Sequence, residues 1–389
     1  VASDGKDSAE SNLWHFESEE KTGGEGGETN TTTTGWTVMI YLDGDNNMDS
    51  YAQMELSEIT SVETNENVTV LVLYDGRGDH NSHLYVSENK SFNEMPLSEI
   101  NPDWSYGNEV NMGDCAPLRE FIGYSMKNYP AGNYMLELWN HGNGWMGICR
   151  DENPADRLTM GEIKNAISGS CEEYGEIIDV LVYTACGMGE IECAYGLTDY
   201  VSYFVASEES VFATGLPHAD ILESIAGNTS MGAHELSEEI VNEYALYYQY
   251  AQSATISAWN MNFIENLTHA VDELAQILSS RTAAHAIEIE DSYYETESFN
   301  SIGIVDLYDF AFNIQKNFAN DSVVNNASQA VIENVTRAIF YEWHGNEHQN
   351  AHGISIYFPP DGNYVSSYEN TDFALHTHWD EFLRAFYGI

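Results

Sequence analysis

Tyr-Met-Leu-Glu-Leu-Trp-Asn-His-Gly, residues 134–142, is a largely apolar, β-prone run that stops at a histidine followed at once by glycine. A second run, Ile-Asp-Val-Leu-Val-Tyr-Thr-Ala-Cys-Gly at 178–187, stops in the same way at a cysteine. Each run is typical of a buried strand. If the two strands lie side by side and parallel, His141 and Cys186 meet at the carboxyl edge of one sheet, where open α/β sheets build their active sites. The pair therefore predicts a cysteine hydrolase.

The rest of the chain alternates predicted strands and helices, which is typical of an α/β protein. Residues 1–35 are polar, with paired glycines and a threonine run, and we interpret them as a flexible leader before one domain over 36–389. We expect a mostly parallel central sheet with helices on both faces, and a helical C-terminal elaboration. The other predicted strands are 36–42, 68–74, 200–206, 255–259 and 353–358, with a hairpin over 82–98. The predicted helices are 48–60, 116–128, 159–173, one after Cys186, 233–250, 261–281, 306–318 and 323–342.

The composition excludes several classes of protein. The chain carries 63 acidic against 13 basic side chains, a formal charge of −50, so nucleic acid is an unsuitable partner. No apolar run approaches the roughly 20 residues that cross a bilayer. Asn-x-Ser/Thr sequons recur along the chain and favour an extracellular or cell-surface location. Five cysteines would then leave at least one thiol outside an intramolecular disulfide, while the other four could form up to two bridges. We expect a monomer.

A nucleophilic cysteine needs a base within hydrogen-bond reach, and donors for the oxyanion that develops on the attacked carbonyl. We assign Cys186 as the nucleophile and His141 as the base. A helix after Cys186 would favour the thiolate through its positive end. The backbone N–H groups of Gly142 and Cys186 would form the oxyanion hole. Taken alone, Cys186 is explained as a small buried apolar residue and His141 as a histidine with its hydrogen bonds satisfied. Their matching positions at the ends of two strands favour a catalytic role for the pair.

The motifs around both residues resemble those of one peptidase family. His-Gly-Asn-Gly-Trp at 141–145 and Ala-Cys-Gly-Met-Gly-Glu-Ile-Glu at 185–192 are similar to the clostripain-type cysteine peptidases, family C11. Trp-Thr-Val-Met-Ile-Tyr at 36–41, Gly-Asp-Asn-Asn at 44–47, Ala-Ser-Glu at 206–208 and Gly-Ile-Ser-Ile-Tyr-Phe-Pro at 353–359 add to the resemblance. It covers about residues 36 to 388. The resemblance implies an α-β-α sandwich of the caspase-like fold and a cysteine endopeptidase that cuts protein or peptide substrates with a His141–Cys186 dyad.

The resemblance also implies cleavage after Arg or Lys, and here the sequence departs from the family. Family members commonly carry Asp two residues before the nucleophile, where it can hold a basic side chain, but this chain has Thr184. A basic P1 residue would then need another carboxylate, for which Glu208 or Glu209 is the nearest candidate by motif. Alternatively, Tyr183 and Thr184 shape a pocket for an uncharged side chain.

The resemblance bears on two further properties. Family members are often made as precursors that are cut in the loop after the histidine strand. Here that loop, Trp145 to Leu158, offers Arg150 and Arg157 as sites of self-cleavage. Calcium dependence is known within the family and is compatible with the acidity of this chain. We expect no required cofactor, and the sequence does not single out a set of calcium ligands.

Two other interpretations of the chain compete with a cysteine peptidase. His344, His348 and His352 are spaced four apart, as zinc ligands on a helix are, but the glycine and asparagines between them favour a loop without metal. A caspase-like surface or binding protein without catalytic activity is the alternative to an enzyme. The presence of both His141 and Cys186 argues against it, because an inactive copy has no chemical need for either.

The acidic loop after the first predicted strand also invites a metal interpretation. Asp-Gly-Asp-Asn-Asn-Met-Asp at 43–49 begins like an EF-hand loop. Met48 and Met54, however, occupy the positions that require Gly and a bidentate Glu. We therefore interpret the acidic and amide side chains of this loop as caps of the following helix.

Overall fold

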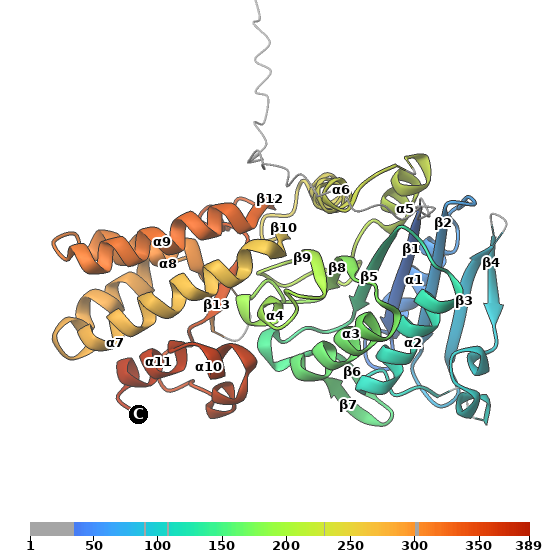
Figure 1. The fold of residues 1–389 in the computed structure, drawn as a ribbon, viewed down its shortest axis with the longest axis horizontal. Coiled ribbons are helices and arrows are strands. Elements are labelled where there is room, and N and C mark those ends of the chain that lie inside the picture. The colour runs from blue at the N-terminus through green and yellow to red at the C-terminus, as the bar shows by residue number, and fades with distance from the viewer. Residues whose placement is uncertain (1–34, 89–90, 107–108, 229, 300–302) are drawn as a thin grey trace, which may run out of the picture.

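The structure is a computed structural model that describes residues 35–88, 91–106, 109–228, 230–299 and 303–389. The expected leader lies outside these residues, except for its last one. Strands and helices alternate through the first half of the chain, as Figure 1 shows. The strands are β1 (Trp36–Asp43), β2 (Val68–Asp75), β3 (Ser82–Glu88), β4 (Ser91–Met95), β5 (Asn133–Trp139), β6 (Ile148–Glu152), β7 (Ala155–Leu158), β8 (Ile178–Thr184), β9 (Val201–Ala206), β10 (Thr255–Asn260), β11 (Ile304–Asp306), β12 (Ile339–His344) and β13 (Ser355–Tyr357). The α-helices are α1 (Asp49–Ile59), α2 (Cys115–Asn128), α3 (Met160–Tyr174), α4 (Ile191–Tyr195), α5 (His218–Gly227), α6 (Ala233–Tyr247), α7 (Ile264–Glu295), α8 (Leu307–Asn317), α9 (Ser322–Ala338), α10 (Asp372–His376) and α11 (Trp379–Tyr387).

Within the described residues, the main sheet has nine strands in the order β12-β10-β9-β8-β5-β1-β2-β3-β4. The central strands β9, β8, β5, β1 and β2 run parallel. Antiparallel strands extend both edges, and the predicted hairpin over 82–98 is β3 with β4. The central parallel strands β1, β2, β5 and β8 are buried along nearly their whole length, which is why they stand out in the sequence as apolar runs. The expected α/β sheet with a parallel centre is confirmed.

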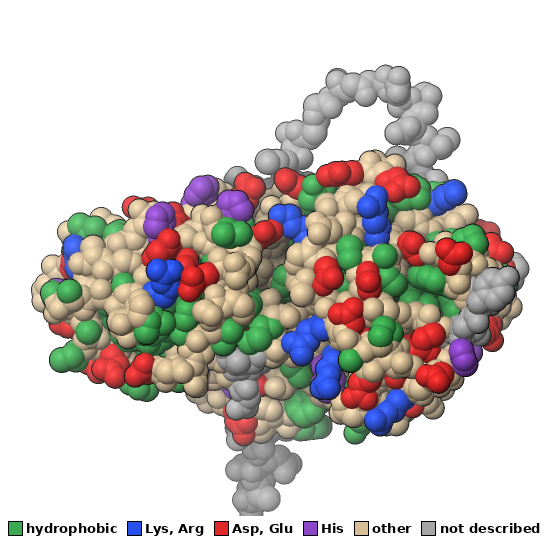
Figure 2. All heavy atoms as spheres, turned by 90° about the horizontal axis from the view of Figure 1, so that it is seen from below, with side chains coloured by type: hydrophobic (Ala, Val, Ile, Leu, Met, Phe, Trp, Pro, Cys, Tyr) green, Lys and Arg blue, Asp and Glu red, His purple; other side chains and the backbone are tan. Residues whose placement is uncertain are grey.

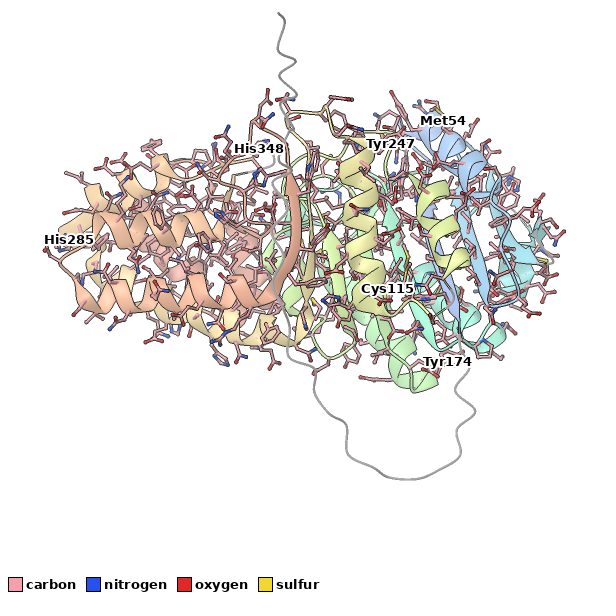
Figure 3. All side chains as sticks on the ribbon, turned by 90° about the horizontal axis from the view of Figure 1, so that it is seen from above. Met54, Cys115, Tyr174, Tyr247, His285 and His348 are labelled. Carbon is pink, nitrogen blue, oxygen red and sulfur yellow. The ribbon has the colours of Figure 1, made fainter. Side chains whose placement is uncertain are left out.

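Side chains alternate between two apolar cores, one on each face of the sheet. In β1, Met39 and Tyr41 belong to one core, whereas Val38 and Ile40 belong to the other. Helices α2 and α3 pack together over the first face, and α1, α5 and α6 contribute to the core on the second. Figures 1 and 3 show these layers from two directions. The arrangement is the α-β-α sandwich that the resemblance implies.

The C-terminal part adds a helical layer beside the β12 edge of the sheet. Helices α7, α8 and α9 pack on one another, and His285, at a kink in α7, is labelled at the tip of this layer in Figure 3. The predicted helix over 323–342 is too long, because α9 ends at Ala338 and β12 begins at Ile339. The run Ile-Phe-Tyr-Glu-Trp-His is rich in residues that favour strands, and its pairing with β10 ends the helix.

Acidic side chains are spread over the face of the molecule seen in Figure 2 and do not gather in one patch. Such a surface is well solvated and repels other anions. In the part of the chain that the structure describes, no helix combines the length and the apolar character needed to cross a membrane.

The central position of β5 gives a stability prediction. Leu136 in β5 has no exposed surface, so Leu136→Ala should lower the free energy of unfolding by about 2–5 kcal/mol, because it empties a packed site in the core. Urea unfolding followed by circular dichroism measures this loss. Leu246→Ala on α6 is the matched control: its side chain is 54% exposed, and the change should stay within about 0.5 kcal/mol. Equal losses in the two variants would contradict a core position for β5.

Candidate active site

The two strand ends that the sequence singles out lie next to each other. Strands β5 and β8 pair in parallel, and the last residues of the pairing are Trp139 and Thr184. His141 and Cys186 each follow two residues later, so the register brings both to the same carboxyl edge of the sheet. A one-residue slip in this pairing would turn one of the two side chains toward the other face.

His141 is half-buried and is held by the loop that follows β1. Its ring Nε2 lies 2.9 Å from Oδ1 of Asn47. A carboxamide oxygen only accepts hydrogen bonds, so this contact requires the proton on Nε2 and leaves Nδ1 with a free lone pair. Burial, with a contribution from the nearby charge of Arg150, lowers the pKa of His141 below its ordinary value. The ring is therefore set up to be neutral near pH 7 and able to accept a proton.

Cys186 is partly exposed and occupies a turn between β8 and α4. Its Sγ lies 3.8 Å from the carbonyl oxygen of Val211, in the segment that follows β9. The expected helix terminus is not at this position, because α4 begins only at Ile191, five residues later. The prediction that a helix dipole stabilises the thiolate is therefore wrong. Cys193 is buried in α4, and all five cysteines are free.

Gly142 allows the loop after His141 to approach the nucleophile closely. A Cβ at this position would lie 2.4 Å from the carbonyl oxygen of Cys186 and 2.9 Å from its nitrogen. The same loop is fixed from the other side by Glu190, whose Oε2 accepts a hydrogen bond from the Trp145 nitrogen at 3.0 Å. The backbone of Gly142 and that of Cys186 are thus in direct contact at the sheet edge.

Thr184 is buried, and its hydroxyl contacts the first of three hydrogen-bonded, charged side chains. Its hydroxyl donates to Oε1 of Glu137 at 2.6 Å. Both oxygens of Glu137 lie 3.0 Å from Nε2 of His218, and Nδ1 of His218 lies 2.6 Å from Glu55. Burial alone lowers the pKa of His218, but the carboxylates of Glu137 and Glu55 outweigh it and raise that pKa well above its ordinary value. This buried Glu-His-Glu group carries a net charge of −1 when both carboxyls are ionised.

The other candidate pocket residues are engaged elsewhere. The ring of Tyr183 is buried and packs edge-on against Phe204, with centroids 5.1 Å apart, because alternate residues of β8 face opposite cores. Glu208 accepts from the Gly353 nitrogen at 3.0 Å, and Glu209 lies 3.5 Å from the ring of His348. We therefore correct the assignment: these three side chains do not join Thr184, although the backbone of Glu209 accepts from Gly187, directly after the cysteine.

The loop expected to carry the processing sites is in part a β-hairpin. Strands β6 and β7 pair antiparallel, with Arg150 opposite Arg157. The side chain of Arg150 is 55% exposed and lies 3.9 Å from Glu152. Both arginines therefore lie in paired strands, and the segment must open before it can occupy an active site in extended form.

The three histidines near the C-terminus do not converge. His344 ends β12 and pairs with Glu342, while His348 and His352 lie in the following loop and pair with Glu297 and Asp306 respectively. The predicted loop is confirmed for the last two histidines and is wrong for His344.

The acidic loop after β1 has a different role from the one we expected. Asp43 and Asp45 are buried and do not cap α1. The N-cap residue is Met48, whose side chain makes no capping hydrogen bond. The side chain of Asn46 accepts a hydrogen bond from the Met48 nitrogen at 2.8 Å. The interpretation of these two aspartates as helix caps is therefore wrong.

Sequence reasoning missed several residues of the site. Asn47 lies in a motif that carried the resemblance and was interpreted only as a helix cap, although β1 is the other neighbour of β5. The same argument from strand ends that found His141 would have found Asn47. Glu55 and His218 had no such signal, because they come from α1 and α5 and meet only through the packing of these helices.

Comparison with known proteins identifies the family to which this chain belongs. Clostripain of Hathewaya histolytica is 26% identical over 419 aligned residues, which cover 88% of this chain and 78% of clostripain. An inactive zymogen of a C11 protease from Parabacteroides distasonis shares the fold, with a TM-score of 0.68 and 19% identity over 90% of this chain and 100% of that chain. A secreted C11 cysteine protease from Bacteroides thetaiotaomicron, solved with an irreversible peptide inhibitor, gives a TM-score of 0.65 and 16% identity over 89% of this chain and 99% of its own. The family model described as the clostripain family matches residues 40–386. The chain therefore belongs to the clostripain family of cysteine endopeptidases.

Proposed function

We propose that this chain hydrolyses peptide bonds with Cys186 as the nucleophile and His141 as the general acid and base. The observation that carries the proposal is the parallel register of β5 and β8, which takes both residues to one edge of the sheet. The contact between the Gly142 and Cys186 backbones supports an oxyanion hole made from their N–H groups. The chemistry uses side chains and backbone of the chain and requires no cofactor.

The steps follow from these roles. The thiol of Cys186 gives its proton to the free ring nitrogen of His141, and sulfur attacks the peptide carbonyl carbon. The carbonyl oxygen becomes an oxyanion next to the two N–H groups. When the tetrahedral intermediate collapses, the C–N bond breaks and His141 returns the proton to the departing amine. Water, deprotonated by His141, then hydrolyses the thioester. In this scheme Asn47 keeps the imidazole in the required tautomer.

We also propose that the chain prefers Arg or Lys at P1, with the Glu55–His218–Glu137 group in place of the missing aspartate. Thr184 occupies the position of that aspartate and donates directly to Glu137. The net negative charge of the buried group supports attraction of a cation to this side of Thr184. Burial raises the pKa of Glu55, so the attraction should grow with pH as Glu55 ionises.

Three finer properties of the peptidase belong to the same proposal. Self-cleavage at Arg150 or Arg157 is supported by the position of the β6–β7 hairpin directly after the His141 loop and by the exposure of Arg150. Export is supported by the sequons and by the secreted relative from Bacteroides thetaiotaomicron. We propose that the chain acts as a monomer, because both dyad residues come from one sheet.

Cys186→Ala should abolish peptide hydrolysis and labelling by a peptidyl electrophile, because it removes the attacking sulfur. Labelling is read by intact mass, and the same variant should remain a single band where the parent chain is cut. Cys115→Ala is the control: it removes a partly buried thiol whose pKa burial raises, and it should keep both activities. A Cys186→Ala chain that is still labelled or still cuts substrate would exclude Cys186 as the nucleophile.

Gly142→Ala should lower kcat roughly 100-fold, the scale of losing an oxyanion donor, because its Cβ displaces the backbone of Cys186. Steady-state kinetics on a short peptide measures the effect, and the melting temperature checks the fold. Gly161→Ala on α3 is the matched control, since a Cβ there meets open space. An unchanged kcat in a folded Gly142→Ala enzyme would disprove the role given to this backbone.

Glu55→Gln should reduce the ratio of kcat/KM for an Arg substrate to that for its norleucine analogue, by about 10-fold or more. In the parent enzyme the same ratio should rise with pH as Glu55 ionises. Glu209→Gln, the alternative by motif, should leave the ratio unchanged because Glu209 is engaged with His348. If Glu209→Gln lowers the ratio and Glu55→Gln does not, Glu209 supplies the counter-charge for the basic side chain. A ratio below one in the parent enzyme would indicate a pocket for uncharged side chains.

A further inference from the structure

A small pocket opens between the C-terminal ends of helices α7 and α11, which pack against each other in the helical layer (Figure 1). Its volume is about 190 Å³. Glu290, Tyr293 and Tyr294 line it from α7, and their spacing of three and four residues places them on one face of that helix. Helix α11 contributes its last two residues, Phe386 and Tyr387. Aromatic rings from two helices therefore line this pocket.

These rings stand at steep angles to one another. Tyr293 and Tyr294 have ring centroids 5.3 Å apart and planes at 68°. Phe386 and Tyr387 also have centroids 5.3 Å apart, with planes at 63°. Phe358, which has no exposed surface, supports both helices, because its ring centroid lies 4.7 Å from that of Tyr293 and 5.6 Å from that of Phe386. Rings at such angles present their faces in different directions, as the walls of an aromatic cage do.

The charge at this pocket is negative. Glu290 and Asp361 line it, and both are exposed and have no ion-pair partner among the described residues. In the part of the chain that the structure describes, no Lys, Arg or His lines the pocket. Arg384 of α11 is paired elsewhere, with Glu369 at 3.4 Å and Asp380 at 3.6 Å. The two carboxylates at the pocket are therefore not compensated.

Two helix ends add to this negative charge. Helix α7 ends at Glu295 and α11 at Tyr387, so the aromatic residues of the pocket lie in the last turn of each helix. The last carbonyls of a helix carry partial negative charge, which attracts cations. Burial, together with neighbouring tyrosines and Asp361, raises the pKa of Tyr387, and its hydroxyl donates to the Pro359 carbonyl. The ring is thus neutral and fixed in place.

We propose that this pocket binds an alkylammonium group, of the kind that choline or a methylated lysine side chain carries. The faces of aromatic rings attract such a cation, and its methyl groups pack on the same rings. Glu290 and Asp361 would balance its charge. A neutral apolar ligand would leave these carboxylates without a partner, and they would repel an anion. The proposal is independent of the peptidase reaction, because the pocket shares no residue with the candidate active site.

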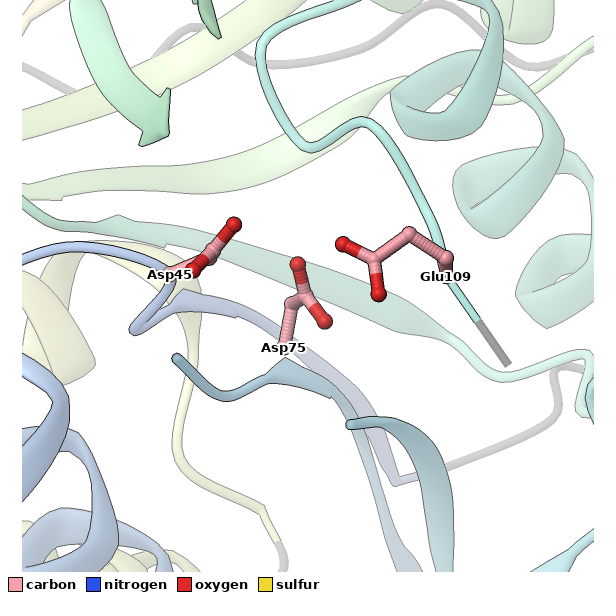
Figure 4. A group of neighbouring side chains, drawn as sticks. All are labelled: Asp45, Asp75 and Glu109. Carbon is pink, nitrogen blue, oxygen red and sulfur yellow. The ribbon is translucent and has the colours of Figure 1, made fainter. Parts of the chain in front are cut away.

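Carboxylates also converge at the sheet edge, but their arrangement is different. Asp45, Asp75 and Glu109, shown in Figure 4, each have an oxygen within 4.8 Å of the others. This spacing leaves no room for an organic group between them. Glu290 and Asp361, in contrast, come from separate segments and stand beside aromatic walls. An alkylammonium group therefore fits the pocket between α7 and α11 and not the cluster at the sheet edge.

Binding can be measured apart from catalysis in the full chain with Cys186→Ala. Isothermal titration with choline chloride should show one saturable site per chain. The uncharged isostere of choline, in which a tert-butyl group replaces the trimethylammonium group, should bind at least about 10-fold more weakly, because the ring faces and carboxylates attract charge. An acetylated and amidated trimethyllysine tests the source of the group. Binding tighter than that of choline assigns the pocket to a protein side chain, and weaker binding assigns it to a free small cation.

Variants test the rings and the carboxylates separately. Tyr294 is 72% exposed, so its replacement should leave the melting temperature unchanged. Tyr294→Leu should weaken choline binding about 3–5-fold, because it keeps an apolar side chain but removes a ring face, whereas Tyr294→Phe should keep the affinity. Tyr250→Leu, at a ring that is 85% exposed on another part of the surface, is the matched control. Glu290→Gln should weaken binding, while Glu273→Gln, at an exposed acid of the same helix, should not.

Three results would overturn the proposal. The first is the absence of saturable choline binding in the Cys186→Ala chain. The second is equal affinity for choline and its uncharged isostere, which would show that charge plays no part. The third is an unchanged affinity in either Tyr294→Leu or Glu290→Gln, which would place the bound choline outside this pocket.

Discussion

The pairing register of β5 with β8 is the constraint on which the geometry of the proposed catalytic pair depends. Because side chains alternate along a strand, the match of Trp139 with Thr184 decides which side chains reach the carboxyl edge and which enter the cores. It directs Thr184 toward the Glu137 group and Tyr183 toward the opposite core. The same register takes His141 and Cys186, each two residues beyond this pair, to the same edge of the sheet. Apolar packing on both faces of the sheet maintains this register.

Buried carboxylates surround this edge and hold its loops. Glu190 fixes the loop after His141, while Glu137 and Glu55 enclose His218 under Thr184. Removing one partner from such a buried group usually costs more than the group contributes as a whole. Here the buried carboxylates fix the positions of the loops, since each one joins segments that are distant in the sequence. The acidity of the chain is therefore partly structural and not only a property of its surface.

The sequence was sufficient to predict the sheet, the family and the meeting of His141 and Cys186 at one sheet edge, because parallel strands appear as continuous apolar runs with reactive residues at their ends. It was insufficient where long-range packing decides the outcome. Glu208 and Glu209 were chosen by proximity to a motif, but their contacts depend on segments near residues 306 and 350. The helix expected after Cys186 starts late, because the chain first makes a turn in which Gly187 adopts a positive φ of 64°. His344 was assigned to a loop, but pairing of β12 with β10 makes it the end of a strand.

The central claim is that His141 and Cys186 act as a pair, and the rate of alkylation of Cys186 tests it most directly. A peptidyl electrophile that binds like a substrate should label the parent chain rapidly, and His141→Ala should slow labelling at saturating reagent by at least about 100-fold. The modified residue is identified by peptide mapping, and an unchanged melting temperature shows that the fold is retained. A His141→Ala chain that is alkylated at Cys186 as fast as the parent would contradict the account.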